Sequence, residues 1–300
     1  MKQLFITGEM RSGTTFLCNF LNSQENINAF SDLYTTIFME AHAMGIQSID
    51  QVLTERHRNV LHSNLAQSFR LNGLDPEKIK RFHYNSWWEF YERGLETVTD
   101  NSSIKYVGSK RTREIGYIRQ LIDKGVRIIY IYRDPRDVMI SGYNRFGSFD
   151  LNTFINQWKD SIEYFLSLGS HENLHLLKFE NLILQSKDEL NRLGEFLDIS
   201  ISTEVASAEL KFGKKNKFIN NSSFSDVNKL FDSNAVGRWK GSDLNKHIIL
   251  TEVILKNLMY ELGYEQSNLK NSNTNNWVSG YNSYNRKKYI KSFFKNFLNL

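Results

Sequence analysis

Short apolar runs alternate along this chain with stretches in which apolar residues recur at the spacing of a helix. The apolar runs are typical of buried parallel strands, and they lie at residues 3–8, 26–32, 103–110, 126–132 and 173–180. Helical spacing is found at residues 14–23, 112–124, 187–198 and 243–262. Strands that alternate with helices build a parallel sheet covered on both faces. The pattern therefore predicts an α/β protein with a doubly wound, mostly parallel sheet flanked by helices.

The same pattern divides the chain into three parts. Residues 1–264 carry the strands and helices of one predicted domain, residues 265–279 are a polar linker rich in Asn and Ser, and residues 280–300 form a basic amphipathic C-terminal helix. The apolar positions of this helix are Ile290, Phe293, Phe294, Phe297 and Leu298. Such a helix is suited to peripheral contact with a membrane, to docking on its own domain or to a dimer contact. The sequence leaves the oligomeric state open.

The composition of the chain constrains its expected class and cellular compartment more than its function. A chain of 300 residues with 40% hydrophobic content can bury a sizeable core, and its formal net charge of +5 is too mild to establish a polyanionic partner. Cys18 is the single cysteine, so no disulfide forms within the chain and a reducing compartment is expected. No leader precedes the first strand, and no apolar stretch approaches the roughly 20 residues of a membrane span. We therefore expect a soluble, cytoplasmic protein.

The segment FITGEMRSGTTFL, residues 5–17, has the layout of a phosphate-binding loop between a strand and a helix. Gly8 and Gly13 fit the glycines of a Walker A motif, but Thr14 stands where that motif has its lysine. Backbone amides at a helix start converge on an anion, and the helix dipole favours negative charge there. The side chains that add donors are Arg11, Ser12, Thr14 and Thr15. The segment predicts an anion site, with a plain structural turn as the alternative.

A second candidate anion site follows the strongest predicted strand. In YRDPRDVMISGY, Arg133 closes the strand, Asp134 and Pro135 start a helix, and Ser141 lies two turns further on. A guanidinium is a planar fork suited to bidentate binding of a phosphate. On its own, this motif is better explained by a helix cap with local salt bridges.

Together the two motifs resemble the sulfotransferases that use 3′-phosphoadenosine 5′-phosphosulfate (PAPS) as the sulfuryl donor. The resemblance extends to VGSK, LLKFENLILQSKDELNRLGEFLDI and NAVGRWKG at residues 107–110, 176–199 and 234–241. RSGTTFL is more similar to the carbohydrate, tyrosylprotein and bacterial branches of that family than to the small-phenol branch. The resemblance covers about residues 3–262, so residues 1–264 are expected to form a sulfotransferase domain with a P-loop-like fold.

The resemblance implies that the sulfuryl group of PAPS is transferred to an acceptor hydroxyl, with PAPS as co-substrate and without a metal. In the family the first loop holds the 5′-phosphosulfate and the second motif holds the 3′-phosphate. The residues implied to bind PAPS are Arg11, Ser12, Gly13, Thr14, Thr15, Arg133, Ser141, Arg238, Trp239 and Lys240. Arg11 is expected to neutralise the leaving phosphate, and Lys110 to contact the sulfuryl oxygens. The alternative for Arg11 is a surface arginine that caps a turn, and the alternative for Lys110 is a solvated lysine.

Sulfuryl transfer to a hydroxyl also calls for a general base. Asp32 falls near the position at which the tyrosylprotein and some bacterial relatives carry an acidic residue, usually Glu. The alternative role of Asp32 is the N-cap of a helix beginning near Leu33. His42 and His83 are rival bases, although for each of them the favoured interpretation is an ordinary surface or partly buried histidine.

The acceptor is expected to be a glycan, a glycolipid or another small metabolite. Two other functions compete with sulfuryl transfer. An atypical P-loop kinase predicts Mg²⁺-dependent binding of ATP, which the missing lysine opposes. A non-catalytic module that binds anions or nucleic acid predicts strongly salt-dependent binding. Because the chain has a modest net charge and no recognisable nucleic-acid motif, no nucleic-acid partner is expected.

Overall fold

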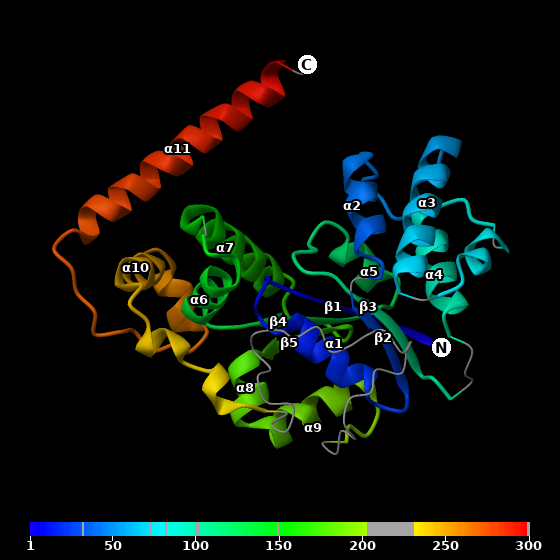
Figure 1. Cartoon of the computed structure of the whole chain (residues 1–300), viewed down its shortest axis with the longest axis horizontal. Helices are drawn as coiled ribbons and strands as arrows, with labels where there is room; N and C mark the ends of the chain where they lie inside the picture. Colours follow the sequence, from blue (N-terminus) through cyan, green and yellow to red (C-terminus); the bar gives the residue numbers. More distant parts are fainter. Residues whose placement is uncertain are drawn as a thin grey trace. The chain divides into compact units, whose positions relative to one another are not determined.

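The structure is a computed structural model that describes residues 1–31, 33–72, 74–81, 83–99, 103–148, 150–202 and 231–298; of residues 80–81 and 289–298 only the backbone is described. Figure 1 shows the whole chain. It splits into two compact units. We call residues 1–132 and 167–232 the sheet unit, and residues 133–166 and 233–300 the helical unit.

The sheet unit is built on five parallel strands in the order β2-β3-β1-β4-β5. The strands are β1 (Lys2–Gly8), β2 (Ile27–Ser31), β3 (Tyr106–Lys110), β4 (Arg127–Tyr132) and β5 (Leu174–Lys178). Leu4, Phe5 and Ile6 of the central strand β1 are wholly buried, as expected for a strand covered on both faces. The predicted α/β fold is confirmed, and each predicted strand is present.

Helices of the sheet unit pack against this sheet. They are α1 (Thr14–Asn22), α2 (Thr35–Ala43), α3 (Glu55–Leu71), the 3₁₀-helix η1 (Pro76–Arg81), α4 (Trp87–Thr97), α5 (Ile118–Asp123), α8 (Phe179–Leu184) and α9 (Ser186–Leu197). Figure 1 shows α2, α3 and α4 gathered together. Phe38 of α2 packs edge-on against Trp87 of α4, with ring centroids 4.7 Å apart, and Trp87 stacks on Tyr117 at 5.3 Å. This aromatic core fixes α2 against the segment that precedes α5.

The predicted helix over residues 112–124 is wrong at its start, because α5 begins only at Ile118. Residues 111–117 form a loop instead. The amide of Arg113 donates to the carbonyl of Gly8, at 3.0 Å, and Arg113 has a positive φ of 59°. A helix at these residues would remove that bond to the end of β1.

The helical unit contains α6 (Pro135–Phe146), α7 (Leu151–Ser167), η2 (Ser233–Ala235), η3 (Arg238–Gly241), α10 (Asn245–Glu261) and α11 (Thr274–Leu298). As predicted, Asp134 caps α6, and its carboxylate accepts from the amide of Arg136 at 2.9 Å. The C-terminal helix begins at Thr274, earlier than residue 280, and Tyr281 of its first turns donates to Asn156 of α7. The apolar side chains at its far end lie outside the described ones. No helix among the described residues is long and apolar enough to cross a membrane.

Candidate active site

The first predicted anion loop connects β1 to α1 in the sheet unit. Gly8 ends β1 so close to β4 that a Cβ atom there would lie 2.1 Å from the carbonyl oxygen of Ile131. Gly13 is the N-cap of α1 with a left-handed φ of 97°, and a Cβ atom there would lie 2.6 Å from the ring of Phe179. Both positions therefore need glycine, for close approach at the first and for backbone conformation and packing at the second.

Polar groups of this loop point to an anion. The N-cap of α1 is Gly13, so no side chain caps the start of this helix, where backbone amides favour an anion. The hydroxyl of Ser12 is wholly buried and has no hydrogen-bond partner among the described residues. Thr14 is buried and Thr15 is half-buried beside it. A buried hydroxyl without a partner is costly unless a ligand satisfies it, so the loop is suited to bind an anion.

Two cations of the sheet unit lie near this loop in sequence or in register. Arg11 lies within the loop, half-buried, with a positive φ of 70°. Lys110 is the last residue of β3, is buried, and is aligned with Ile6 of β1 and Ser31 of β2. Both therefore sit at or next to the carboxyl ends of the strands, where open α/β sheets bind their ligands. The predicted base Asp32, which follows Ser31, lies outside the described residues.

A charged cluster that the sequence analysis did not assemble occupies the same end of the sheet. Loop 111–117 bonds back to β1, because the amide of Glu114 donates to the hydroxyl of Thr7 at 3.3 Å. Arg113 donates to the buried carboxylate of Glu9 at 2.8 Å. The wholly buried carboxylate of Glu114 pairs with Arg111 and lies 3.1 Å from Nε2 of His42.

The His42 ring is held but not enclosed. It stacks on the ring of Tyr117, with the ring centroids 4.5 Å apart and an angle of 6° between the ring planes. The side chain of His42 is 38% exposed. Burial lowers the pKa of His42 from its ordinary value of 6.5, and the nearby Arg111 guanidinium lowers it further. The imidazole is therefore neutral at pH 7 and able to accept a proton. His83, the other rival base, is exposed.

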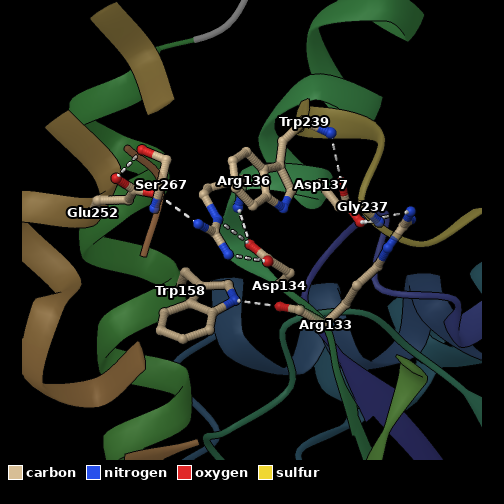
Figure 2. A network of polar contacts seen from close by, with 9 residues as sticks. All are labelled: Arg133, Asp134, Arg136, Asp137, Trp158, Gly237, Trp239, Glu252 and Ser267. Atoms are coloured by element: carbon tan, nitrogen blue, oxygen red, sulfur yellow. Dashed lines mark hydrogen bonds and ion pairs between the residues drawn. The ribbon is translucent and has the colours of Figure 1, made fainter. Parts of the chain in front are cut away.

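The second predicted anion motif opens the helical unit, and Figure 2 shows its polar contacts. Arg133 is 2% exposed, and its guanidinium donates to the carbonyl of Ala235. Asp137 lies 3.8 Å from that guanidinium and accepts from the backbone amides of Gly237 at 2.8 Å and of Trp239 at 3.0 Å. The structure thus brings Arg133 together with the NAVGRWKG segment, through a carboxylate that the sequence analysis left unassigned.

Arg136 is the centre of the same network. It donates twice to Asp134, at 2.9 and 2.6 Å, and pairs with Glu252 of α10. Glu252 also accepts from the amide and the hydroxyl of Ser267, at 2.8 and 2.6 Å. The Arg136 guanidinium lies 3.7 Å from the ring centroid of Trp239, which is 8% exposed. One face of the Trp239 indole, which belongs to a residue implied to bind PAPS, is therefore occupied by Arg136.

The other residues of the helical unit that are predicted to bind the nucleotide are Ser141, Arg238 and Lys240. Ser141 is buried on α6, one helical turn beyond Asp137 and on the same face. Arg238 is half-buried and donates to the carbonyl of Asn234 at 2.9 Å. Lys240 is exposed, with its ammonium 5.7 Å from the Trp239 ring centroid. No group of three or more His, Cys, Asp or Glu that could hold a metal is present in the described part of the chain.

Comparison with known proteins decides the family. The family model described as "Sulfotransferase domain" matches residues 1–251. This chain belongs to the sulfotransferase family. Sulfotransferase 2A1 of Rattus norvegicus is 24% identical over 152 residues, which cover 41% of this chain and 53% of the relative. The chain thus spans about half the length of the curated sulfotransferases that it matches.

Solved sulfotransferases share the fold. The sulfotransferase domain of the Synechococcus PCC 7002 olefin synthase superposes with a TM-score of 0.59 at 15% identity, covering 89% of this chain and 96% of that one. The sulfotransferase domain from the curacin biosynthetic pathway gives 0.52 at 17% identity, over 89% and 99% of the two chains. At these identities the likeness concerns the fold alone.

Proposed function

We propose that this sulfotransferase moves the sulfuryl group of PAPS to an acceptor hydroxyl. The observation that carries the proposal is the β1–α1 loop, in which a buried Ser12 hydroxyl and uncapped helix amides stand where a Walker loop would rely on lysine. A sulfuryl group carries less charge than a terminal phosphate, so amide and hydroxyl donors with one cation suffice for it. The proposed transfer needs no metal.

We assign the two ends of the nucleotide to two sets of residues. Those proposed for the 5′-phosphosulfate are Arg11, Ser12, Gly13, Thr14 and Thr15, and those for the 3′-phosphate are Arg133, Ser141, Arg238 and Lys240, with Trp239 close to the base. The strand order supports this division, because β1 and β4 are neighbours, with Gly8 paired to Ile131, and each motif directly follows one of these strands. Ligands of open α/β sheets bind outside such strand ends.

Bound PAPS supplies the sulfuryl group and a bisphosphate leaving group, and the protein positions them and stabilises charge. Arg11 is proposed to neutralise the departing phosphate, together with the hydroxyls of Thr14 and Thr15. A guanidinium stays protonated, so Arg11 acts by its charge and its hydrogen bonds and not as an acid. Lys110 is proposed to contact the sulfuryl oxygens. For the base, Asp32 and His42 are the candidates.

Ligand-induced thermal shifts test the proposal. The melting temperature should rise with adenosine 3′,5′-bisphosphate in the presence of EDTA, and much less with ADP or with ATP and Mg²⁺. Ser141→Ala and Lys240→Ala should weaken the preference for the 3′-phosphate, and Asp150→Asn, at the start of α7, is the matched control. A stronger response to ATP and Mg²⁺ would favour the kinase, and salt-dependent RNA binding without 3′-phosphate preference would favour the binding module.

The acceptor and the setting are also proposals. A glycan, a glycolipid or a small metabolite is proposed as acceptor, and the single cysteine supports a reducing, cytoplasmic setting. Contact of α11 with an anionic membrane is supported by the exposed side chains of Arg286, Lys287 and Lys288. Co-sedimentation with vesicles containing phosphatidylserine tests this contact, and removal of residues 286–300 should abolish it.

A further inference from the structure

His42 occupies a defined place at the ligand end of the sheet unit. Its helix α2 is fixed by the aromatic core, and its ring lies flat on Tyr117. A Cβ atom at Gly116 would lie 2.6 Å from Cε1 of His42, so loop 111–117 closes on the ring where that glycine stands. The ring, which projects from α2, is thus packed against loop 111–117.

Glu114 determines which ring nitrogen carries the proton. Its carboxylate lies 3.1 Å from Nε2 of His42, accepts from the amide of Tyr117 at 3.1 Å and pairs with Arg111. A carboxylate accepts hydrogen bonds, so Nε2 is the protonated nitrogen and Nδ1 carries the lone pair. Among the described residues Nδ1 makes no hydrogen bond. The basic nitrogen is therefore left for a ligand.

The same loop joins His42 to the proposed PAPS loop. Glu114 bonds to Thr7, and Arg113 bonds to the Gly8 carbonyl and to Glu9. Thr7, Gly8 and Glu9 run directly into the anion loop. One continuous set of hydrogen bonds thus connects the imidazole to the backbone that is proposed to hold the sulfuryl donor.

We propose that His42, oriented by Glu114, is the general base that takes the proton from the acceptor hydroxyl. This proposal rests on the proposed sulfuryl transfer. The acceptor oxygen forms a bond to sulfur, the bond from sulfur to the bisphosphate oxygen breaks, and the acceptor proton moves to Nδ1 of His42. Glu114 stabilises the resulting imidazolium, which returns its proton to water through its exposed edge. Glu114 is a positioning residue, because it acts through His42.

Two exposed apolar residues close to His42 along α2 and loop 111–117 bear on the choice of acceptor. Met39 lies one turn before His42 on α2 and is 54% exposed, and Ile115 lies between the two loop residues that meet His42 and is 39% exposed. Exposed apolar side chains on the two elements that hold the ring favour an alcohol carried on an apolar body. Among the proposed acceptors, this favours a hydroxyl on an apolar molecule over a free sugar.

Nuclear magnetic resonance tests the protonation state without any acceptor. The full-length protein labelled with ¹⁵N, with His42→Gln to assign the signal among seven histidines, should show His42 neutral and protonated at Nε2 at pH 7.5. Glu114→Gln should weaken the preference for that tautomer. A His42 that is charged at pH 7.5, or that is protonated at Nδ1, overturns the proposal.

Acceptors of different acidity test the role itself. With radiolabelled PAPS, His42→Gln should slow transfer to 2-phenylethanol by about 10²–10⁴-fold. It should slow transfer to 4-nitrophenol far less, because a substantial fraction of this acidic phenol is already ionised at neutral pH. His57→Gln is the matched control, since Gln also fits the capping box that His57 makes at α3. Equal losses for both acceptors, or a collapse with Asp32→Asn but not with His42→Gln, would overturn the assignment.

Different results would contradict the proposed sulfuryl transfer and the proposed base His42. Binding of adenosine 3′,5′-bisphosphate must persist in His42→Gln, as measured by thermal shift, because the histidine is not assigned to the nucleotide. A wild-type protein that neither binds this nucleotide nor transfers sulfate to any acceptor contradicts the proposed function. A wild-type protein that binds and transfers, and whose His42→Gln variant does so at the same rate, contradicts only the base. Glucose in place of 2-phenylethanol tests the acceptor class, and faster transfer to glucose overturns it.

Discussion

The sheet unit and the helical unit each contain a cluster of buried acids and arginines, but only one of the clusters is open. In the helical unit, Arg136 joins Asp134 to Glu252 and lies against Trp239, with every one of these side chains at most one-tenth exposed. In the sheet unit, the buried carboxylate of Glu114 contacts the ring of His42, whose side chain is 38% exposed. The first cluster pairs carboxylates with an arginine, whose charge is permanent, whereas the second pairs a carboxylate with a histidine, whose charge changes with pH.

This difference matches the two tasks that sulfuryl transfer sets. Binding a 3′-phosphate needs fixed cations, and a buried network of ion pairs fixes them because each partner constrains the others. Deprotonating an alcohol needs a group that changes its charge near neutral pH and that reaches the substrate. The two clusters therefore predict opposite outcomes: breaking the first should cost stability, and breaking the second should cost turnover.

The largest effect on stability is expected from Arg136→Met. This change keeps an unbranched apolar stem but leaves Asp134 and Glu252 without their cation in a buried setting. Breaking a buried pair in this way costs about 3–5 kcal/mol of unfolding free energy. Urea unfolding followed by circular dichroism measures it.

Lys105→Met is the control for that experiment. Lys105 pairs with Asp198, whose side chain is 81% exposed, at 2.7 Å. Exposed pairs contribute about 0–1 kcal/mol. Equal losses in the two variants would mean that the Arg136 network is no more important to stability than a surface pair.

Gly13→Ala probes the packing that shapes the anion loop. The new Cβ would lie 2.6 Å from the Phe179 ring, on a residue whose φ is 97°. Overpacking costs about 1–3 kcal/mol, and the thermal shift with adenosine 3′,5′-bisphosphate should shrink as well. Gly45→Ala has a similar φ of 72° but nothing within 4 Å of the new Cβ, so it isolates the backbone strain. Gly13→Ala should be the more damaging of the two, and the reverse order would contradict the packing argument.

Asp137→Asn should separate affinity from stability within the helical unit. Gly237 and Trp239 donate to different carboxylate oxygens of Asp137, and asparagine has an NH₂ group in place of one of them. One backbone amide therefore loses its acceptor, and the RWKG segment loosens. An unsatisfied buried group costs about 1–3 kcal/mol, equivalent to about 5- to 150-fold in affinity. By isothermal calorimetry the loss should fall on adenosine 3′,5′-bisphosphate and not on adenosine 5′-monophosphate. Equal losses for both nucleotides would assign Asp137 a structural role alone.

The sequence predicted what is local and missed what is long-range. The strands, the loop with Gly8 and Gly13, and the cap Asp134 follow from neighbouring residues, and all are present. The predicted end of the last strand is wrong, because β5 ends at Lys178 and Phe179 begins α8. The contacts of Asp137 with Gly237 and Trp239 span about a hundred positions, and His42 meets Glu114 from 72 positions away. No spacing rule pairs such residues before the fold is known.

The error at residues 112–117 has a physical reason of the same kind. Their helical spacing is real, but the bonds of Arg113 and Glu114 to the end of β1 stabilise a loop instead. One signal was readable: the charge-rich stretch KRTRE directly follows a predicted strand, at the end where α/β sheets bind ligands. Taken as a ligand-end loop, it would have marked Glu114 as a candidate partner for a histidine.

The smallest expected effect compares the two units through one histidine each. Burial and Arg111 lower the pKa of His42, which also faces Glu114 and Tyr117; burial and Lys246 lower the pKa of His247, which faces Tyr143. Since both values fall below 6.5, the unfolded chain binds more protons, and stability decreases as the pH falls through 6.5 toward the folded-state pKa.

His42→Gln and His247→Gln should therefore each flatten the fall of unfolding free energy between about pH 7 and pH 5, measured by urea unfolding at each pH. The double variant should flatten it by the sum of the two, to within about 0.5 kcal/mol, because the histidines share no partner. Only His42→Gln should also change the pH dependence of transfer, removing the loss of rate at acid pH. A loss of rate that survives in His42→Gln and vanishes in His247→Gln would transfer the titrating role to the helical unit and reverse the contrast between the two clusters.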